Sequence, residues 1–167
     1  APTFGDLRIA GGTRTLVAPT ATTRDLEVEI NATLDVAAQT LSVAGSLDSS
    51  PSNAVIQGTA PIQLTGTGDL RTHTEIPAVH VTGGTRTGWT STLAALELVS
   101  GELHVRDNAT VTVTGDATFT GGTLSFDTTI GNWDRLDVEG AVIQTGTVIG
   151  STSDQTHLYC AGDWLAD

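Results

Sequence analysis

Three acidic residues alternate with aliphatic ones near the start of the chain. Asp25, Glu27 and Glu29 each precede an aliphatic residue, and side chains two positions apart on a β-strand point to the same side. Carboxylate oxygens are the ligands that Ca²⁺ prefers, so this spacing defines a candidate calcium site. The alternative is a solvated outer face, which we favour because the sequence lacks the glycine- and aspartate-rich nonapeptide of calcium-binding repeats. We expect no other metal or cofactor.

A second group of acidic residues lies towards the end of the chain. Asp134, Asp137, Glu139 and Asp163 are the best source of the two carboxyl groups that glycoside hydrolysis requires. Such a site also needs a pocket or groove for its substrate. The chain has only three Trp, one Tyr and three Phe to line one, and its turns are short. We therefore expect no catalytic residues and predict that the protein is not an enzyme.

The four histidines and the single cysteine are spread along the chain. His73, His80, His104 and His157 show no His-x-His or His-x-x-x-His spacing, which argues against a zinc site. We expect His80 and His104 to face outward, because polar residues stand at the matching positions of other strand patterns. Cys160 stands at an inward position, where a thiol acts as a small hydrophobic side chain.

The overall charge excludes two classes of partner. The 167 residues carry 19 Asp and Glu against 7 Arg and Lys, a formal net charge of −12. Nucleic-acid binding requires a basic surface, and an anionic membrane surface repels an acidic chain. No apolar run approaches the roughly 18 residues of a membrane-spanning helix. We therefore expect neither a nucleic-acid partner nor insertion into a membrane, and the length suits one domain.

Short stretches of alternating apolar and polar residues dominate the sequence. They run from Leu7-Arg8-Ile9 to Leu136-Asp137-Val138, and clusters of Gly, Thr, Asp and Asn separate them. Alternation with a period of two, enriched in Thr, Val and Ile, is typical of strands with one buried face. The sequence therefore predicts an all-β protein.

The strand patterns also recur at a longer interval. Residues 11–15 and 83–87 both read Gly-Gly-Thr-Arg-Thr, and three following strand patterns match at shifts of about 70 residues. Residues 1–167 are thus predicted to form one repeat-built domain, with repeats at about 4–75 and 76–135 and a partial repeat at about 136–167. The paired glycines are expected to supply positive φ angles in turns.

Two architectures are compatible with these patterns. Short turns, strands of similar length and a single apolar side favour stacked coils around a shared interior. At about 20–24 residues per coil, the chain would form a right-handed parallel β-solenoid of seven or eight coils, with Val43 and Val113 pointing inward. The alternative is an antiparallel β-sandwich.

Several motifs support the solenoid. They are Leu26-x-Val28, Thr33-Leu34-x-Val36, Thr40-Leu41-x-Val43-x-Gly45 and the closing Leu158-Tyr159-Cys160-Ala161-Gly162-Asp163-Trp164. This series resembles the β-solenoid repeats of large secreted bacterial surface proteins of the adhesin-like or autotransporter-passenger-like type. The resemblance implies a structural or adhesive role at the cell exterior, and it implies no catalytic residues.

We therefore expect a segment of a longer extracellular array that forms a stiff rod, stalk, sheath or filament by coil stacking. Its partners would be further repeats of the same chain or a neighbouring subunit, because an uncapped coil presents unpaired backbone groups. The alternative is a module that binds a glycan or a surface protein through residues 48–53 or through exposed Trp89 and Trp133. A polysaccharide-degrading enzyme ranks third.

Overall fold

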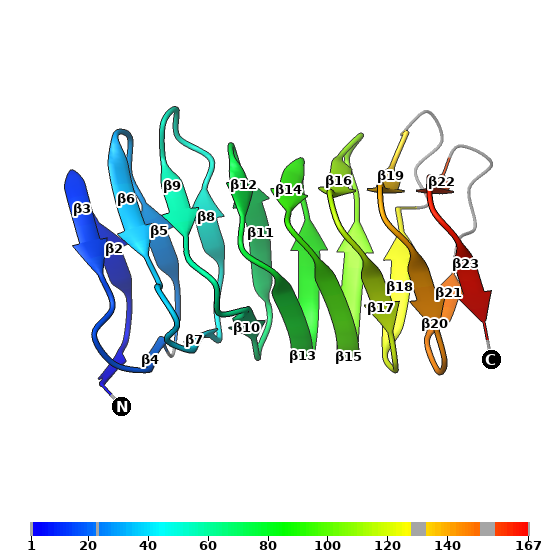
Figure 1. Ribbon diagram of the computed structural model, residues 1–167, viewed down its shortest axis with the longest axis horizontal. Helices are drawn as coiled ribbons and strands as arrows, with labels where there is room; N and C mark the ends of the chain where they lie inside the picture. The colour runs from blue at the N-terminus through cyan, green and yellow to red at the C-terminus, as the bar shows by residue number, and fades with distance from the viewer. Residues whose placement is uncertain (1, 23, 128–132, 151–155, 167) are drawn as a thin grey trace.

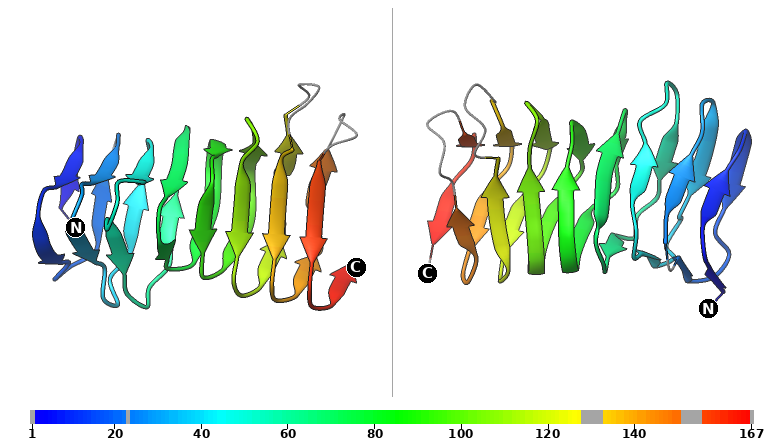
Figure 2. Two further views of the ribbon diagram at one scale, coloured as in Figure 1. Left: turned by 90° about the horizontal axis from the view of Figure 1, so that it is seen from above. Right: turned by 180° about the vertical axis from the view of Figure 1, so that it is seen from behind.

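The computed structural model describes residues 2–22, 24–127, 133–150 and 156–166. Within these ranges every regular element is a strand, and every strand pair is parallel. The strands stack coil upon coil into a β-solenoid of about seven turns, and the two ends of the chain lie at opposite ends of the row (Figures 1 and 2). The predicted parallel solenoid is confirmed, and the antiparallel sandwich is wrong.

Each coil contributes strands to three faces, which we call the first, second and third face. The first face contains β1 (Thr3–Phe4), β4 (Thr20–Thr22), β7 (Leu41–Val43), β10 (Ile62–Leu64), the start of β13 (Val79–Gly88), the start of β15 (Leu96–Val105), β17 (Ala117–Phe119), β20 (Val142–Gln144) and β23 (Trp164–Ala166). The second face contains β2 (Leu7–Ile9), β5 (Leu26–Val28), β8 (Leu47–Ser49), β11 (Gly68–Thr72), the ends of β13 and β15, β18 (Thr123–Phe126) and β21 (Val148–Gly150). The third face contains β3 (Gly12–Thr15), β6 (Ala32–Asp35), β9 (Val55–Gln57), β12 (Glu75–Ile76), β14 (Ser91–Leu93), β16 (Thr110–Val113), β19 (Arg135–Val138) and β22 (His157–Cys160).

The core fills the space between the three faces. Alternate residues of each strand point inward, and the parallel register places apolar residues of one coil on those of the next, as in Leu41 on Ile62 and Val43 on Leu64. Val43 and Val113 are both fully buried, as the alternation predicts. Burying one such side chain contributes about 1.5–3 kcal/mol, so the stacked aliphatic layers hold the coils together.

Each strand pairs with the corresponding strand of the next coil. Neighbouring strands pair residues between 17 and 25 positions apart, as in Val79 with Leu96 and Thr110 with Arg135. The two Gly-Gly-Thr-Arg-Thr segments consequently occupy different environments. Arg14 lies exposed in β3 on the third face, whereas Arg86 lies fully buried in β13 on the second. The match at about 70 residues is therefore a match of sequence between different faces.

Glycines mark the corner between the first and second faces. Gly84 and Gly101 have φ angles of 67° and 81°, in the left-handed region that favours glycine. A Cβ at either position would also overlap the backbone of the preceding coil. Of the predicted turn glycines, Gly11, Gly12 and Gly84 have positive φ. Gly83 does not, and its small size instead allows close approach to the carbonyl of Thr65.

Candidate functional site

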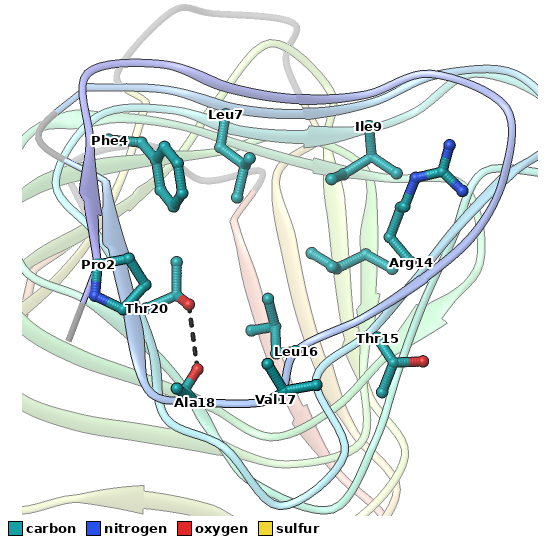
Figure 3. A pocket seen from close by; sticks show the side chains of 11 residues that line it. Pro2, Phe4, Leu7, Ile9, Arg14, Thr15, Leu16, Val17, Ala18 and Thr20 are labelled. Carbon is teal, nitrogen blue, oxygen red and sulfur yellow. Dashed lines mark hydrogen bonds between the residues drawn. The ribbon is translucent and has the colours of Figure 1, made fainter.

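The first coil surrounds an apolar hollow at the N-terminal end. Figure 3 looks into this space, with Phe4, Leu7 and Leu16 pointing into it. The hollow measures about 180 Å³. Among the described residues, no strand lies beyond β1, β2 or β3. Phe4 is therefore 42% exposed, although it is in register with the buried, inward-facing Thr22.

The C-terminal end leaves its last core layer uncovered in the same way. Trp164 is in register with buried Val142 but is itself 45% exposed. Leu158 and Cys160 follow the buried positions of β19 and are half-buried at the edge of the core. In the described part of the chain, no strand lies beyond β21, β22 or β23. Both ends thus present apolar side chains along the solenoid axis.

The two ends differ in charge. The first 18 residues contain Arg8 and Arg14 against Asp6, whereas the last 28 contain three aspartates and no arginine. Arg14 lines the N-terminal hollow, and its Nη1 donates to the carbonyl of Thr13 at 3.1 Å. At the other end, exposed Asp163 directly precedes β23. Exposed Arg14 and exposed Asp163 are thus charges of opposite sign near the two ends.

The candidate calcium ligands lie on or beside β5. Both Glu27 and Glu29 form ion pairs with the Nε of Arg8, the first at 3.5 Å. Oδ1 of Asp25 accepts the backbone N–H of Ser46, one coil further on, at 2.7 Å. Across the described ranges, no three His, Cys, Asp or Glu side chains are placed to hold a metal ion. The structure gives all three carboxylates protein partners, and the preference for a solvated outer face over a calcium site stays a prediction.

The acidic residues considered for glycoside hydrolysis are dispersed. Asp134 is fully buried, and its Oδ1 accepts the backbone N–H of Asn108 at 2.9 Å. Asp137 points to the outer side of β19 and pairs with Arg135 at 2.7 Å. Glu139 and Asp163 are exposed after β19 and β22. The structure does not bring these four residues together.

Asp134 predicts a specific pH dependence. Burial raises the pKa of Asp134 above its ordinary value, and the nearby Asp127 raises it further, against the lowering effect of backbone N–H groups. Above pH 3.8, the ordinary pKa of the side chain, Asp134 therefore keeps its proton in the folded protein more readily than in the unfolded chain. The contribution of this residue to stability is present at low pH and is lost as pH rises through the raised pKa. We expect Asp134→Asn to remove that part of the pH slope, as measured by urea denaturation at a series of pH values.

The control for this prediction is Glu139→Gln, which removes an exposed carboxyl and makes the same change in net charge. It should keep the Asp134 contribution to the slope. Equal slopes in Asp134→Asn and the wild type would contradict the prediction.

The histidines lie at separate places. His80, on the first face, lies 3.2 Å from Glu97 of the next coil through its Nδ1. His73 follows β11, His104 lies on the second face and His157 on the third. His80 and His104 stand at the outward positions of their strands, which confirms the expected orientation.

A polar cluster on the second face was not predicted from the sequence. Oγ of Ser125 donates to Oε1 of Glu102 at 2.5 Å and accepts from Nδ1 of His104 at 2.8 Å. Because the hydroxyl proton points to the carboxylate, His104 is the donor and is not placed to act as the base for Ser125. The cluster instead links two coils. Ser125 lies 21 residues from His104 and 23 residues from Glu102, so only knowledge of the coil length could have related it to them.

Trp89 and Trp133 have different environments. Trp89 is half-buried, and the guanidinium carbon of Arg71 lies 4.2 Å from its ring centroid. Trp133 is 56% exposed and stacks on His157, with 5.8 Å between ring centroids and 15° between planes.

The segment 48–53, considered above as a recognition loop, begins with a local turn. Oδ1 of Asp48 accepts the backbone N–H of Ser50 at 2.8 Å.

Arg86 is a second feature that the sequence patterns did not indicate. Its guanidinium reaches back two coils and donates to the carbonyls of Val43, at 2.7 Å, Ala44, at 3.3 Å, and Gly45. Burial lowers the pKa of Arg86 to about 10, and the charge of Asp25 opposes that effect. The side chain is therefore charged at neutral pH and joins its own coil to the coil two positions back from within the core.

Comparison with protein-family models, with curated proteins and with solved structures gives no match. The described residues contain no helix that is long and apolar enough to span a membrane.

Proposed function

We propose that this chain is a structural segment of an extracellular β-solenoid that extends into a stiff rod or filament by stacking of its end coils. The observation that carries the proposal is the pair of uncovered ends. Both present inward-facing side chains of the core, and all strands run parallel, so the C-terminal end of one solenoid can continue into the N-terminal end of the next.

The first face suggests how two copies fit. If β1 of one copy continued the register of β23 of another, Phe4 would lie over Ala166. Phe4, Val43 and Ala166 stand at the same position of their first-face strands. A large side chain over a small one is a packing that fills space without overlap.

The proposal predicts concentration-dependent assembly. In sedimentation velocity, the wild-type chain should form linear species that grow as the protein concentration rises. Trp164→Lys should sediment as a monomer, because a charged side chain would replace an apolar one in the axial contact. High salt should weaken assembly only partly, since most of the contact is apolar.

Leu165→Lys is the matched control. It adds the same charge to the same strand, but Leu165 is in register with Ile143, at an outward position. It should assemble as the wild type does. A wild-type chain that stays monomeric up to millimolar concentration, or equal assembly of both variants, would contradict end stacking.

We place this rod at the cell surface, in the setting of the adhesin-like repeats that its motifs resemble. The net charge of −12 and an exterior rich in Thr, Asp and Glu support a solvated rod in that setting. An antibody against the solenoid should label intact cells of the source organism. We include no catalytic step in this function, because Asp134 is buried whereas Asp137 points to the outer side of β19.

A further inference from the structure

We propose that the third face carries a binding site for a neutral polysaccharide, formed by Trp133, Arg135, His157 and Tyr159. These four residues line a shallow hollow of about 210 Å³ on the side of the solenoid. We call them the aromatic platform. The aromatic platform lies on the outer side of the last two coils, so it does not use the inward-facing side chains of the proposed axial contact.

The strand register holds the aromatic platform in place. Arg135 of β19 stands opposite His157 of β22, and Asp137 stands opposite Tyr159. Trp133 precedes β19, and its backbone N–H donates to Oδ1 of Asn108 at 2.8 Å. Rings carried by a paired sheet lose little conformational freedom when a ligand binds, which favours affinity.

The exposure of the rings indicates a surface built for contact. Trp133 and Tyr159 are each 56% exposed, whereas Trp89 is half-buried against Arg71. The stack of Trp133 on His157 shows that the indole is held by a specific contact. Aromatic side chains that join a flat apolar ring to a polar edge are enriched at recognition surfaces.

The charges of the site favour a neutral ligand. Arg135 is the permanent cation of the aromatic platform. Its Nη2 donates to both carboxylate oxygens of Asp137, at 2.7 and 3.0 Å. This pairing cancels the charge that an anion would need. The net charge of −12 also repels nucleic acids and acidic glycans.

A neutral sugar unit has the complementary chemistry. Its C–H faces can cover an aromatic ring, and its hydroxyls can bond to the Trp133 indole N–H, the Tyr159 hydroxyl and the Arg135–Asp137 pair. His157 and Tyr159 are two positions apart on one strand, about 7 Å, so a chain of linked sugars can contact both rings. A polysaccharide therefore fits better than a single sugar.

The test is isothermal titration with neutral hexasaccharides of glucose, xylose and mannose, namely cellohexaose, laminarihexaose, maltohexaose, xylohexaose and mannohexaose. At least one should bind the wild-type chain, with a change in tryptophan fluorescence. Trp133→Ala and Tyr159→Ala should each weaken that binding by about tenfold or more.

Ile30→Ala is the control variant, since it removes an exposed apolar side chain from a different part of the solenoid; it should bind as the wild type does. Circular dichroism verifies that each variant is folded. Failure of all five hexasaccharides to bind, or unchanged binding by Trp133→Ala, would overturn the proposal. So would a finding that Trp133→Ala alters self-association without altering sugar binding, which would make the platform a protein interface.

Discussion

Arg86→Ala should lower the free energy of unfolding by about 3–5 kcal/mol. The substitution removes a fully buried side chain and leaves the carbonyls of Val43, Ala44 and Gly45 without their guanidinium donor. Truncation of a large core side chain and loss of a buried charged donor each cost several kcal/mol, and here they coincide. Urea denaturation followed by circular dichroism and tryptophan fluorescence measures the change.

Two variants separate the contributions at this position. Arg86→Met restores much of the volume but none of the hydrogen bonds, so its loss should be intermediate. Arg14→Ala changes the same residue of the same pentapeptide at an exposed position, and it should alter stability by less than about 0.5 kcal/mol. The measurements require protein dilute enough to be monomeric. Equal effects of Arg86→Ala and Arg14→Ala would show that the buried contacts contribute nothing.

Gly101→Ala should destabilise the protein more than an ordinary glycine substitution does. Gly101 has a φ of 81°, and a Cβ there would lie 2.4 Å from the carbonyl oxygen of Gly84 in the preceding coil. The left-handed backbone costs about 1–2 kcal/mol for an L-residue, and the overlap must additionally push two coils apart. We expect a total loss of about 3 kcal/mol or more in urea denaturation.

Gly11→Ala isolates the backbone contribution. Gly11 has a φ of 66°, but a Cβ there would meet no atom within 4 Å. Its loss should be about 1 kcal/mol. The difference between the two variants measures how closely the coils approach at the corner between the first and second faces. If Gly11→Ala cost as much as Gly101→Ala, contact between coils would not be the reason for glycine at position 101.

The fold could be predicted because its main determinant is local. Val43 and Val113 each stand in a short stretch of alternation that reports which side of a strand is buried, and three residues are enough to show it. Recurrence of such stretches at short intervals favours coils over hairpins. Arg86 shows the limit of local patterns, since its five-residue neighbourhood is identical to that of exposed Arg14. Only the coils around a residue distinguish the two positions.

The candidate sites were less predictable for a related reason. Trp133 and His157 lie 24 positions apart and belong to neighbouring coils, but coil lengths vary between 17 and 25 residues. A fixed repeat length therefore cannot show which outward residues become neighbours. Asp134 and Asp137 illustrate the converse, because closeness in sequence suggested a pair and the three-residue spacing put them on opposite sides of the chain.

The uniform strand direction has a consequence for symmetry. A two-fold axis through one end would bring two copies of that end together with their strands running in opposite directions, so no existing ladder would be continued. Translation with rotation along the solenoid axis is the operation that preserves it, and such an operation does not close on itself. An assembly that continues the ladders would thus be polar, with two tips that differ in chemistry and that gain or lose subunits at unequal rates.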